Sequence, residues 1–157
     1  MIQIGEAIPA VKVTIIDSDG QNNIAAADYF AGKKAVLFAV PGAFTPTCSE
    51  AHMPGYVVSL DDIKAKGVDI VACLSVNDSF VMSSWQKDQN AEHISMIADG
   101  EAALTKALGL TLETGSFGGT RSQRYSMIIE DGKVTQLNVE PGSDLTVSDA
   151  KTILSQL

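Results

Sequence analysis

Two stretches in the first half of the chain are almost wholly apolar, which predicts strands that are covered on both faces. They are residues 34–40, KAVLFAV, and residues 68–76, VDIVACLSV, and both contain several β-branched side chains. Residues 11–15 instead alternate between apolar and polar positions, as a half-buried strand does. A fourth, shorter strand is expected over residues 94–98.

Helices are expected between these strands. The spacing of apolar positions predicts them over residues 46–66, 79–89 and 101–108. Pro54-Gly55 falls inside the first of these ranges, and we expect a kink there.

A hairpin and a last helix complete the predicted fold. Residues 124–129 and 134–139 have the composition of strands, and Asp131-Gly132 between them is a strong hairpin signal. A helix over 146–157 follows. The order of elements predicts an α/β fold, with a central mixed β-sheet flanked by helices on both faces. No repeat or linker interrupts the pattern, so residues 1–157 are expected to form a single domain.

Composition and charge narrow the range of partners. The net charge of −8 makes nucleic acid and anionic membrane surfaces poor partners. No apolar stretch approaches the ~20 residues of a membrane span, and the N-terminus lacks the pattern of a signal peptide. Two cysteines are too few for a disulfide scaffold. A cytoplasmic location is therefore expected.

Cys48 stands where the central strand ends and the next helix begins, in the stretch PGAFTPTC. Active sites of such folds collect at the carboxyl ends of the strands. If Thr45 caps the helix and Pro46 takes its first position, Cys48 lies in the first turn, where free N–H groups and the helix dipole favour a thiolate. We therefore expect a reactive nucleophile. A buried, inert cysteine is the alternative.

The chain has only two arginines, Arg121 and Arg124, at the start of a predicted strand. A guanidinium beside Cys48 would stabilise the thiolate and hold a polar substrate. Nothing in the local sequence brings either arginine to Cys48, so two surface arginines are the alternative.

Other chemistries of Cys48 have less support. Cys48 and His52 lie four residues apart and would share a helix face, but no second pair with ligand spacing follows, so a metal site is not expected. For His52, a structural hydrogen bond is favoured over a role as base. Thr45 occupies the place of the second cysteine in C-x-x-C, which disfavours disulfide exchange on proteins.

The same residues carry a resemblance to a known family. Residues 41–48 match the pattern P-x-x-x-T-x-x-C of the peroxiredoxins, and the longer string PGAFTPTCSEAHMPGY resembles the type II, or peroxiredoxin-5-like, subfamily. Residues 71–78, 124–132 and 137–141 extend the resemblance over nearly the whole chain. It implies a thioredoxin-like fold and a thiol peroxidase that uses neither metal nor haem.

Carried over by position, the resemblance implies roles for four residues. Cys48 is the peroxidatic cysteine, which attacks the peroxide and becomes a sulfenic acid. The hydroxyl of Thr45 holds the peroxide and the thiolate, Arg124 is the active-site arginine, and Pro41 shields the pocket from water. Hydrogen peroxide and small alkyl hydroperoxides are the expected substrates, and antioxidant defence is the expected purpose.

Recycling of the sulfenic acid departs from part of the family. Some type II members carry a resolving cysteine near the C-terminus, where this chain has Val147. Cys73 lies within a predicted central strand, where buried packing is favoured over a resolving role. We expect a one-cysteine mechanism without a cofactor, with glutathione as the reductant, alone or with glutaredoxin. The alternatives are a two-cysteine peroxidase resolved by Cys73 and reduced by thioredoxin, and a redox sensor that does not turn over.

Type II members often form dimers through loops near the active site, so a homodimer is expected. Phe44 and Phe80 are candidates for exposed contact residues, and core positions are the alternative for both.

Overall fold

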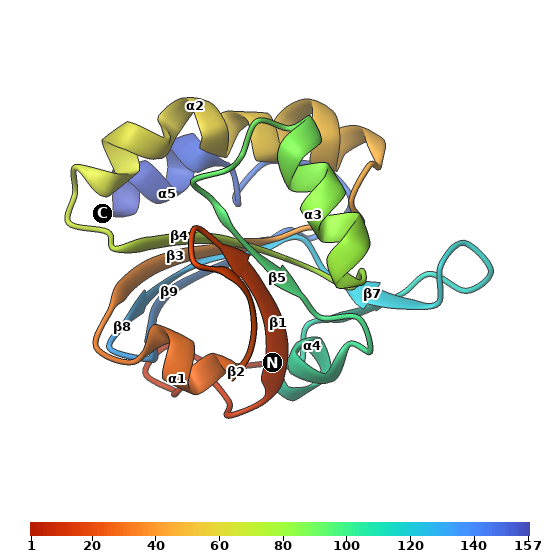
Figure 1. The fold of residues 1–157 in the computed structure, drawn as a ribbon, viewed down its shortest axis with the longest axis horizontal. Coiled ribbons are helices and arrows are strands. Elements are labelled where there is room, and N and C mark those ends of the chain that lie inside the picture. The colour runs from red at the N-terminus through yellow and green to blue at the C-terminus, as the bar shows by residue number, and fades with distance from the viewer.

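One seven-stranded sheet forms the centre of the computed structural model, which describes residues 1–157 (Figure 1). The order of strands across the sheet is β2-β1-β5-β4-β3-β8-β9. The strands are β1 Lys12–Asp17, β2 Gly20–Ala25, β3 Lys34–Ala39, β4 Ile70–Ser75, β5 Ser95–Ala98, β8 Tyr125–Glu130 and β9 Lys133–Val139. β3, β4 and β5 run parallel, whereas β1 and β8 join them in antiparallel pairs. The predicted mixed sheet is confirmed.

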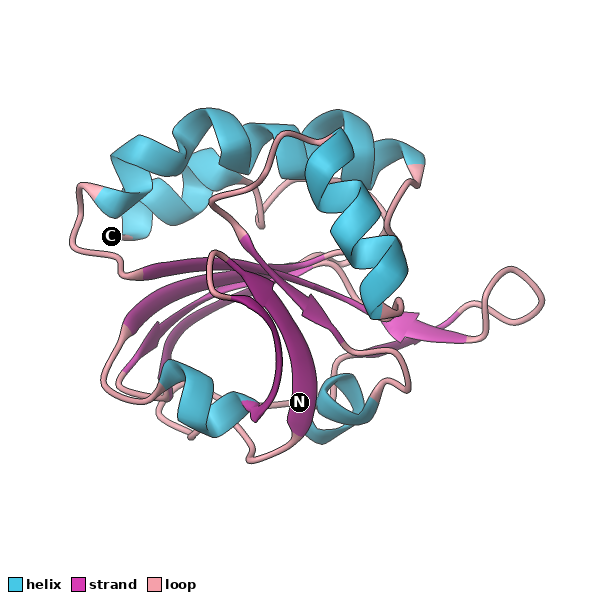
Figure 2. Ribbon diagram, viewed as in Figure 1, coloured by secondary structure: helices cyan, strands magenta, loops and turns pink.

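Helices cover both faces of the sheet, as expected (Figure 2). On one face lie α2 Met53–Lys64, α3 Ser79–Asp88 and α5 Ala150–Gln156, and on the other lie α1 Ala26–Phe30 and α4 Ala103–Leu108. None of the helices combines the length and the apolar character that a membrane crossing needs.

Alternate residues of the central strands fill two cores at once. Along β3, Val36 and Phe38 pack on the side of α2, α3 and α5, whereas Ala35 and Leu37 pack on the side of α1 and α4. Successive side chains of a strand point to opposite faces, so a strand with helices on both sides is apolar at every position. This is why residues 34–40 form a central strand.

The predicted hairpin is also confirmed. β8 and β9 pair antiparallel, and Asp131 and Gly132 between them have φ angles of 49° and 75°. Positive φ at both central residues is what a two-residue type I′ turn requires, and Asp-Gly is a preferred pair for it.

Four short elements escape the hydrophobic pattern. β2 is polar and mostly exposed because it is an edge strand that pairs with β1 alone. α1 has only five residues. β6 Thr111–Glu113 and β7 Thr120–Ser122 form a separate two-stranded hairpin, whose tip projects from the body of the molecule in the cyan part of Figure 1.

The irregularity expected at Pro54-Gly55 lies one turn earlier. Residues Cys48–His52 form a π turn that runs directly into α2, and the N–H of Met53 donates to the carbonyl of Cys48. Pro54 has no N–H with which to continue the regular α-helical bonding at this point. The irregularity that the structure shows in this helix is therefore the π turn that begins at Cys48.

The last helix begins later than predicted, at Ala150 instead of residue 146. Asp149 caps it by accepting from the N–H of Thr152. The N–H groups of residues 146–148 are turned instead to the carboxylate of Glu140, at 2.8–3.1 Å. The hydroxyls of Thr146 and Ser148 donate to the same carboxylate, each at 2.7 Å. Glu140 thus holds the segment between β9 and α5 in place.

We expect Glu140→Gln to lower the free energy of unfolding by about 2 kcal/mol near neutral pH, the scale of hydrogen bonds to a charged group. Burial alone would raise the pKa of Glu140, but the bonds from Thr146, Ser148 and Val147 lower it from 4.5 to about 2. A carboxyl group with a lowered pKa stabilises the folded state fully above pH 4.5, and this contribution is lost as the pH falls through about 2.

Urea denaturation of both proteins at about pH 7 and about pH 3 measures this contribution. The difference in unfolding free energy between wild type and Glu140→Gln should shrink at the lower pH. A difference of the same size at both values would contradict the assignment.

Candidate active site

Cys48 lies where the chain leaves β3 and enters a helix, as predicted. Helical residues begin at Pro46, and the carbonyl of Thr45 accepts from the N–H of Ser49 at 2.9 Å. Cys48 is therefore in the first turn, and its side chain is only 1% exposed. The hydroxyl of Ser49 accepts a hydrogen bond of 3.0 Å from the indole Nε1 of Trp85 in α3, which fixes this turn to its neighbour.

Arg124 is the cation that contacts Cys48. Its Nη2 donates to the Cys48 Sγ across 3.2 Å, and the arginine is 5% exposed. Arg124 directly precedes β8, the neighbour of β3 in the sheet. Side chains of a strand point alternately to its two faces, so Arg124 lies on the same face of the sheet as Ile128. This is the face that α2 covers. The structure thus brings together two residues that are 76 positions apart.

Arg121, the other arginine, donates its hydrogen bonds to backbone carbonyls instead. Its Nε donates to the carbonyl of Gly118 at 3.0 Å, and its Nη1 donates to the carbonyl of Val76 at 3.2 Å. These bonds tie the projecting hairpin to the end of β4. A Cβ atom on Gly118 would lie 2.6 Å from the Arg121 Nη2, so a larger residue there would displace this guanidinium.

His52 is fully buried and contacts Arg124, not Cys48. The Arg124 Nη1 lies 2.9 Å from the His52 Nδ1, and the His52 Nε2 lies 3.0 Å from the carbonyl oxygen of Ser148. Burial and the neighbouring Arg124 lower the pKa of His52 from 6.5 to about 3. Of the two roles considered for His52, the structural hydrogen bond is the one found.

Pro41, Thr45 and Arg124 line a cleft of about 500 Å³ beside the cysteine. Cys48 itself is buried and is not among the residues that line the cleft. The hydroxyl of Thr45 donates to the carbonyl of Gly42 at 2.6 Å and so does not cap the helix. The other lining residues are Pro46, Thr47, Leu112, Thr114, Phe117, Gln123, Glu140, Pro141, Gly142 and Ser143.

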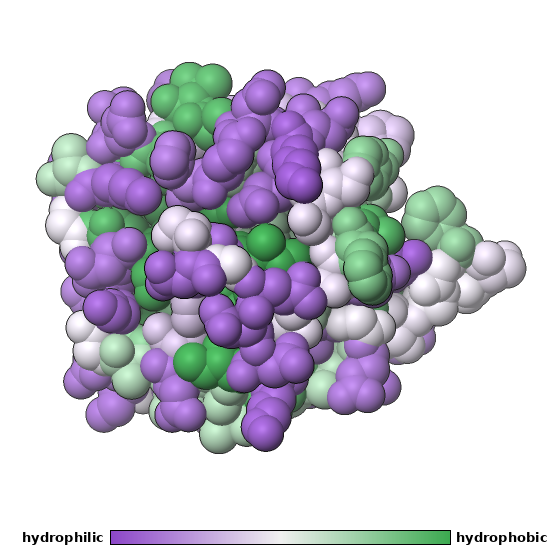
Figure 3. All heavy atoms as spheres, in the orientation of Figure 1, coloured by the Kyte–Doolittle hydropathy of each residue, from purple (hydrophilic) through white to green (hydrophobic).

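Aromatic side chains are exposed around this end of the molecule. Phe44, Phe80 and Phe117 are 52%, 85% and 73% exposed, so Phe44 and Phe80 are not core residues. Hydrophobic surface is visible in Figure 3 where α3 approaches the projecting hairpin. The N–H of Ala43 donates to the Asn77 side chain at 3.0 Å, which joins the loop that carries Phe44 to the start of α3.

Cys73 lies inside the sheet and does not line the cleft. It is fully buried in β4, where it pairs with Phe38 of β3 and Met96 of β5. Both cysteines are free and belong to the same core. Burial, and to a smaller extent Cys48, raise the pKa of the Cys73 thiol well above its usual value.

The sequence analysis missed part of the network behind Arg124. Ser148 accepts from His52, and also from the Tyr56 hydroxyl at 2.9 Å, while Glu140 holds Ser148. Glu140 belongs to the stretch 137–141 that carries the family resemblance, and this was the available signal for it. Ser148 acts through its backbone carbonyl, which no side-chain pattern reveals.

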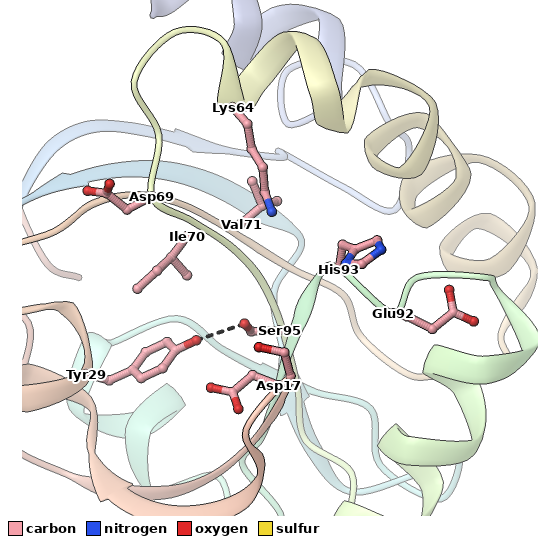
Figure 4. Close-up of a pocket in the computed structure, with 10 residues that line it drawn as sticks. Asp17, Tyr29, Lys64, Asp69, Ile70, Val71, Glu92, His93 and Ser95 are labelled. Carbon is pink, nitrogen blue, oxygen red and sulfur yellow. Dashed lines mark hydrogen bonds between the residues drawn. The ribbon is translucent and has the colours of Figure 1, made fainter.

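A second cavity, of about 240 Å³, lies away from the cysteines (Figure 4). Its wall combines Asp17, Asp69 and Glu92 with Lys64 and the other histidine, His93. The Tyr29 hydroxyl donates to the Ser95 hydroxyl at its edge, at 2.8 Å. No cysteine lines this cavity, so it is not part of the Cys48 site.

Comparison with known proteins places the chain in a family. Residues 3–154 match the Redoxin family model. Peroxiredoxin-2B of Arabidopsis thaliana is 43% identical over 159 residues, which cover 99% of this chain and 98% of the relative.

Solved structures agree with this match. The crystal structure of reduced Prx3 in complex with hydrogen peroxide from Vibrio vulnificus has a TM-score of 0.96 and 56% identity, covering 99% of both chains. Peroxiredoxin 5 from Alvinella pompejana has a TM-score of 0.85 and 36% identity, covering 99% of this chain and 97% of the other. The chain therefore belongs to the redoxin family, as a peroxiredoxin: a thiol peroxidase with a thioredoxin-like fold.

Proposed function

We propose that this peroxiredoxin reduces hydrogen peroxide and small alkyl hydroperoxides at Cys48, and that an external thiol returns the cysteine to its reduced form. The observation that carries the proposal is the 3.2 Å contact between the Arg124 Nη2 and the Cys48 Sγ. A buried guanidinium needs a counter-charge. The one salt bridge of the structure joins Lys34 to Glu130, so no carboxylate pairs with Arg124 and a Cys48 thiolate is its natural partner.

The reaction is a displacement at oxygen. The thiolate attacks the terminal peroxide oxygen, the one that carries hydrogen, and the O–O bond breaks. Cys48 becomes a sulfenic acid while hydroxide or alkoxide leaves and takes a proton. Negative charge builds on the departing oxygen. Donors that already face this position lower the barrier without moving. Arg124 and Thr45, which line the cleft beside the sulfur, are the side chains proposed for this work.

The burial of Cys48 affects its reaction with peroxide and its reduction by a thiol differently, because the two reactants differ in size. Because Cys48 is only 1% exposed, we expect a molecule as small as hydrogen peroxide to reach its sulfur with less rearrangement than a tripeptide thiol needs. Reduction by glutathione, with or without glutaredoxin, therefore needs the turn Cys48–His52 to open. Loss of the thiolate charge on oxidation weakens the bond to Arg124 and favours this opening.

We propose a one-cysteine cycle because Cys73 is poorly placed to resolve the sulfenic acid. Its pKa is raised by burial, which keeps it a thiol, and only the thiolate is nucleophilic. It also lies in a central strand that is paired on both sides. Glutathione would instead attack the sulfenic acid and release water, and a second glutathione would free Cys48 as the thiol.

Intact mass after one equivalent of hydrogen peroxide tests the cycle. We expect the reduced protein to gain one oxygen within a second, and Cys48→Ser to gain none. The matched variant Cys73→Ser should gain the oxygen and keep its glutathione-supported turnover.

Two other results would redirect the proposal. A loss of two hydrogens, or a disulfide-linked dimer, that disappears in Cys73→Ser would assign resolution to Cys73 and favour thioredoxin as reductant. Oxidation of Cys48 without any turnover by thiols would favour the redox sensor.

Replacement of the active-site cation tests the role of Arg124. We expect Arg124→Lys to lower the second-order rate with hydrogen peroxide by roughly 10²- to 10³-fold, as for the loss of a donor to a developing oxyanion. Arg121→Lys is the control, since Arg121 bonds only to backbone carbonyls. Stopped-flow kinetics of the reduced proteins give both rates. Equal rates for wild type and Arg124→Lys would refute the role.

We also propose that the chain forms a homodimer through the exposed aromatic residues around the site. Large exposed apolar side chains that lie near one another mark association surfaces. We expect Phe80→Asp to produce a monomer in sedimentation velocity. Val58→Asp is the matched control, because Val58 on α2 is equally exposed at 85%. A wild-type protein that sediments as a monomer at high concentration would refute the proposal.

A further inference from the structure

We propose that His52 is the positioning residue of the active site: its neutral imidazole accepts a hydrogen bond from Arg124 Nη1 and thereby holds Nη2 on the sulfur of Cys48. The inference rests on the proposed roles of Cys48 and Arg124. The contacts that carry it are the 2.9 Å distance from Arg124 Nη1 to His52 Nδ1 and the 3.2 Å distance from Arg124 Nη2 to Cys48 Sγ.

The contacts determine which ring nitrogen carries the proton. A guanidinium has donors only, so the His52 Nδ1 facing it must offer a lone pair. The proton of the neutral ring is then on Nε2, which donates to the Ser148 carbonyl at 3.0 Å. Both nitrogens are used, and neither is available as a base for Cys48.

The ring has no freedom to turn away from Arg124. It is fully buried, with its centroid 5.0 Å from that of Phe38 and 5.6 Å from that of Tyr56. Phe38 and Tyr56 are themselves stacked, with centroids 3.8 Å apart. The three nitrogens of a guanidinium lie in one rigid plane, so a bond that fixes Nη1 also fixes Nη2.

A chain of hydrogen bonds links the His52 ring back to the backbone of Arg124. His52 is held by Ser148, and the N–H and hydroxyl of Ser148 donate to Glu140 at 2.8 and 2.7 Å. The backbone N–H of Glu140 in turn donates to the carbonyl of Arg124 at 3.0 Å. The backbone and the guanidinium of Arg124 are thus anchored by the same set of residues.

The charges around His52 suit a neutral acceptor. Arg124 faces it from the start of β8 and Tyr56 from α2, while Glu140 and Asp149 act from the segment before α5. Burial and Arg124 together keep the pKa near 3 against the opposing effect of the two carboxylates. A carboxylate in place of the imidazole would share the positive charge of Arg124. An uncharged acceptor orients the guanidinium and leaves that charge to the thiolate.

Two amide variants of His52 test separately the hydrogen bonds that its two ring nitrogens make. In His52→Asn the amide oxygen takes roughly the place of Nδ1 and still accepts from Arg124. In His52→Gln the amide reaches the place of Nε2 and still donates to Ser148. We expect His52→Gln to lower the second-order rate with hydrogen peroxide by about 10- to 100-fold, the usual effect of losing a group that orients a functional side chain. His52→Asn should recover most of this loss.

Thr105→Val on α4 is the control for stability, because it removes a buried hydrogen bond of 2.7 Å to Asp99 on the other face of the sheet from Arg124. It should lower the melting temperature and leave the peroxide rate unchanged. The reaction of Cys48 with iodoacetamide gives a second readout: its rate should fall in His52→Gln and not in Thr105→Val. Rates that follow melting temperature across all three variants would overturn the proposal.

The wild-type protein provides a test that needs no variant. The chain has only two histidines, His52 and His93, so their ring nitrogen signals are readily told apart by nuclear magnetic resonance. We expect His52 to remain the neutral Nε2–H form down to about pH 4. An Nδ1–H ring, or a ring that gains a proton near its ordinary pKa of 6.5, would overturn the proposal even if every variant failed to fold.

Discussion

A guanidinium held against a sulfur atom is the constraint around which this molecule is arranged. The two groups are distant in the chain, and the pairing of β8 with β3 brings them to the same end of these two strands. Burying an arginine without a carboxylate partner is unfavourable, so the fold must supply either a counter-charge or neutral acceptors. The acceptors that the structure places against the guanidinium are the sulfur of Cys48 and the imidazole of His52, whose pKa is lowered by burial and by Arg124.

The C-terminal segment completes the site from outside the sheet. Glu140 uses its carboxylate to hold the backbone of residues 146–148, and that backbone in turn holds His52. Residues 140–149 contain no cysteine and no basic residue, yet they hold His52, which contacts Arg124. Substitutions at residues 146–148, which do not line the cleft, are therefore expected to change reactivity through His52 and Arg124.

The sequence predicts those features that depend on local pattern. β3 and β4 are apolar because both faces are covered, and Cys48 lies at a helix start because Thr45-Pro46 begins one. β2 was missed because an edge strand of polar residues has no hydrophobic signature. The start of α5 was misplaced because Glu140, six residues before Thr146, takes up the N–H groups that a helix would leave free. The contact between Arg124 and Cys48 depends on strand order, which local pattern does not contain. The family resemblance supplied that pairing instead.

The bond between Trp85 and Ser49 gives the protein an optical property. Trp85 is the single tryptophan of the chain, it is fully buried, and its indole is bonded to the residue that follows the reactive cysteine. An opening of the turn that displaces Ser49 would break or stretch this bond. We therefore expect the intensity and wavelength of tryptophan emission to change when the turn opens.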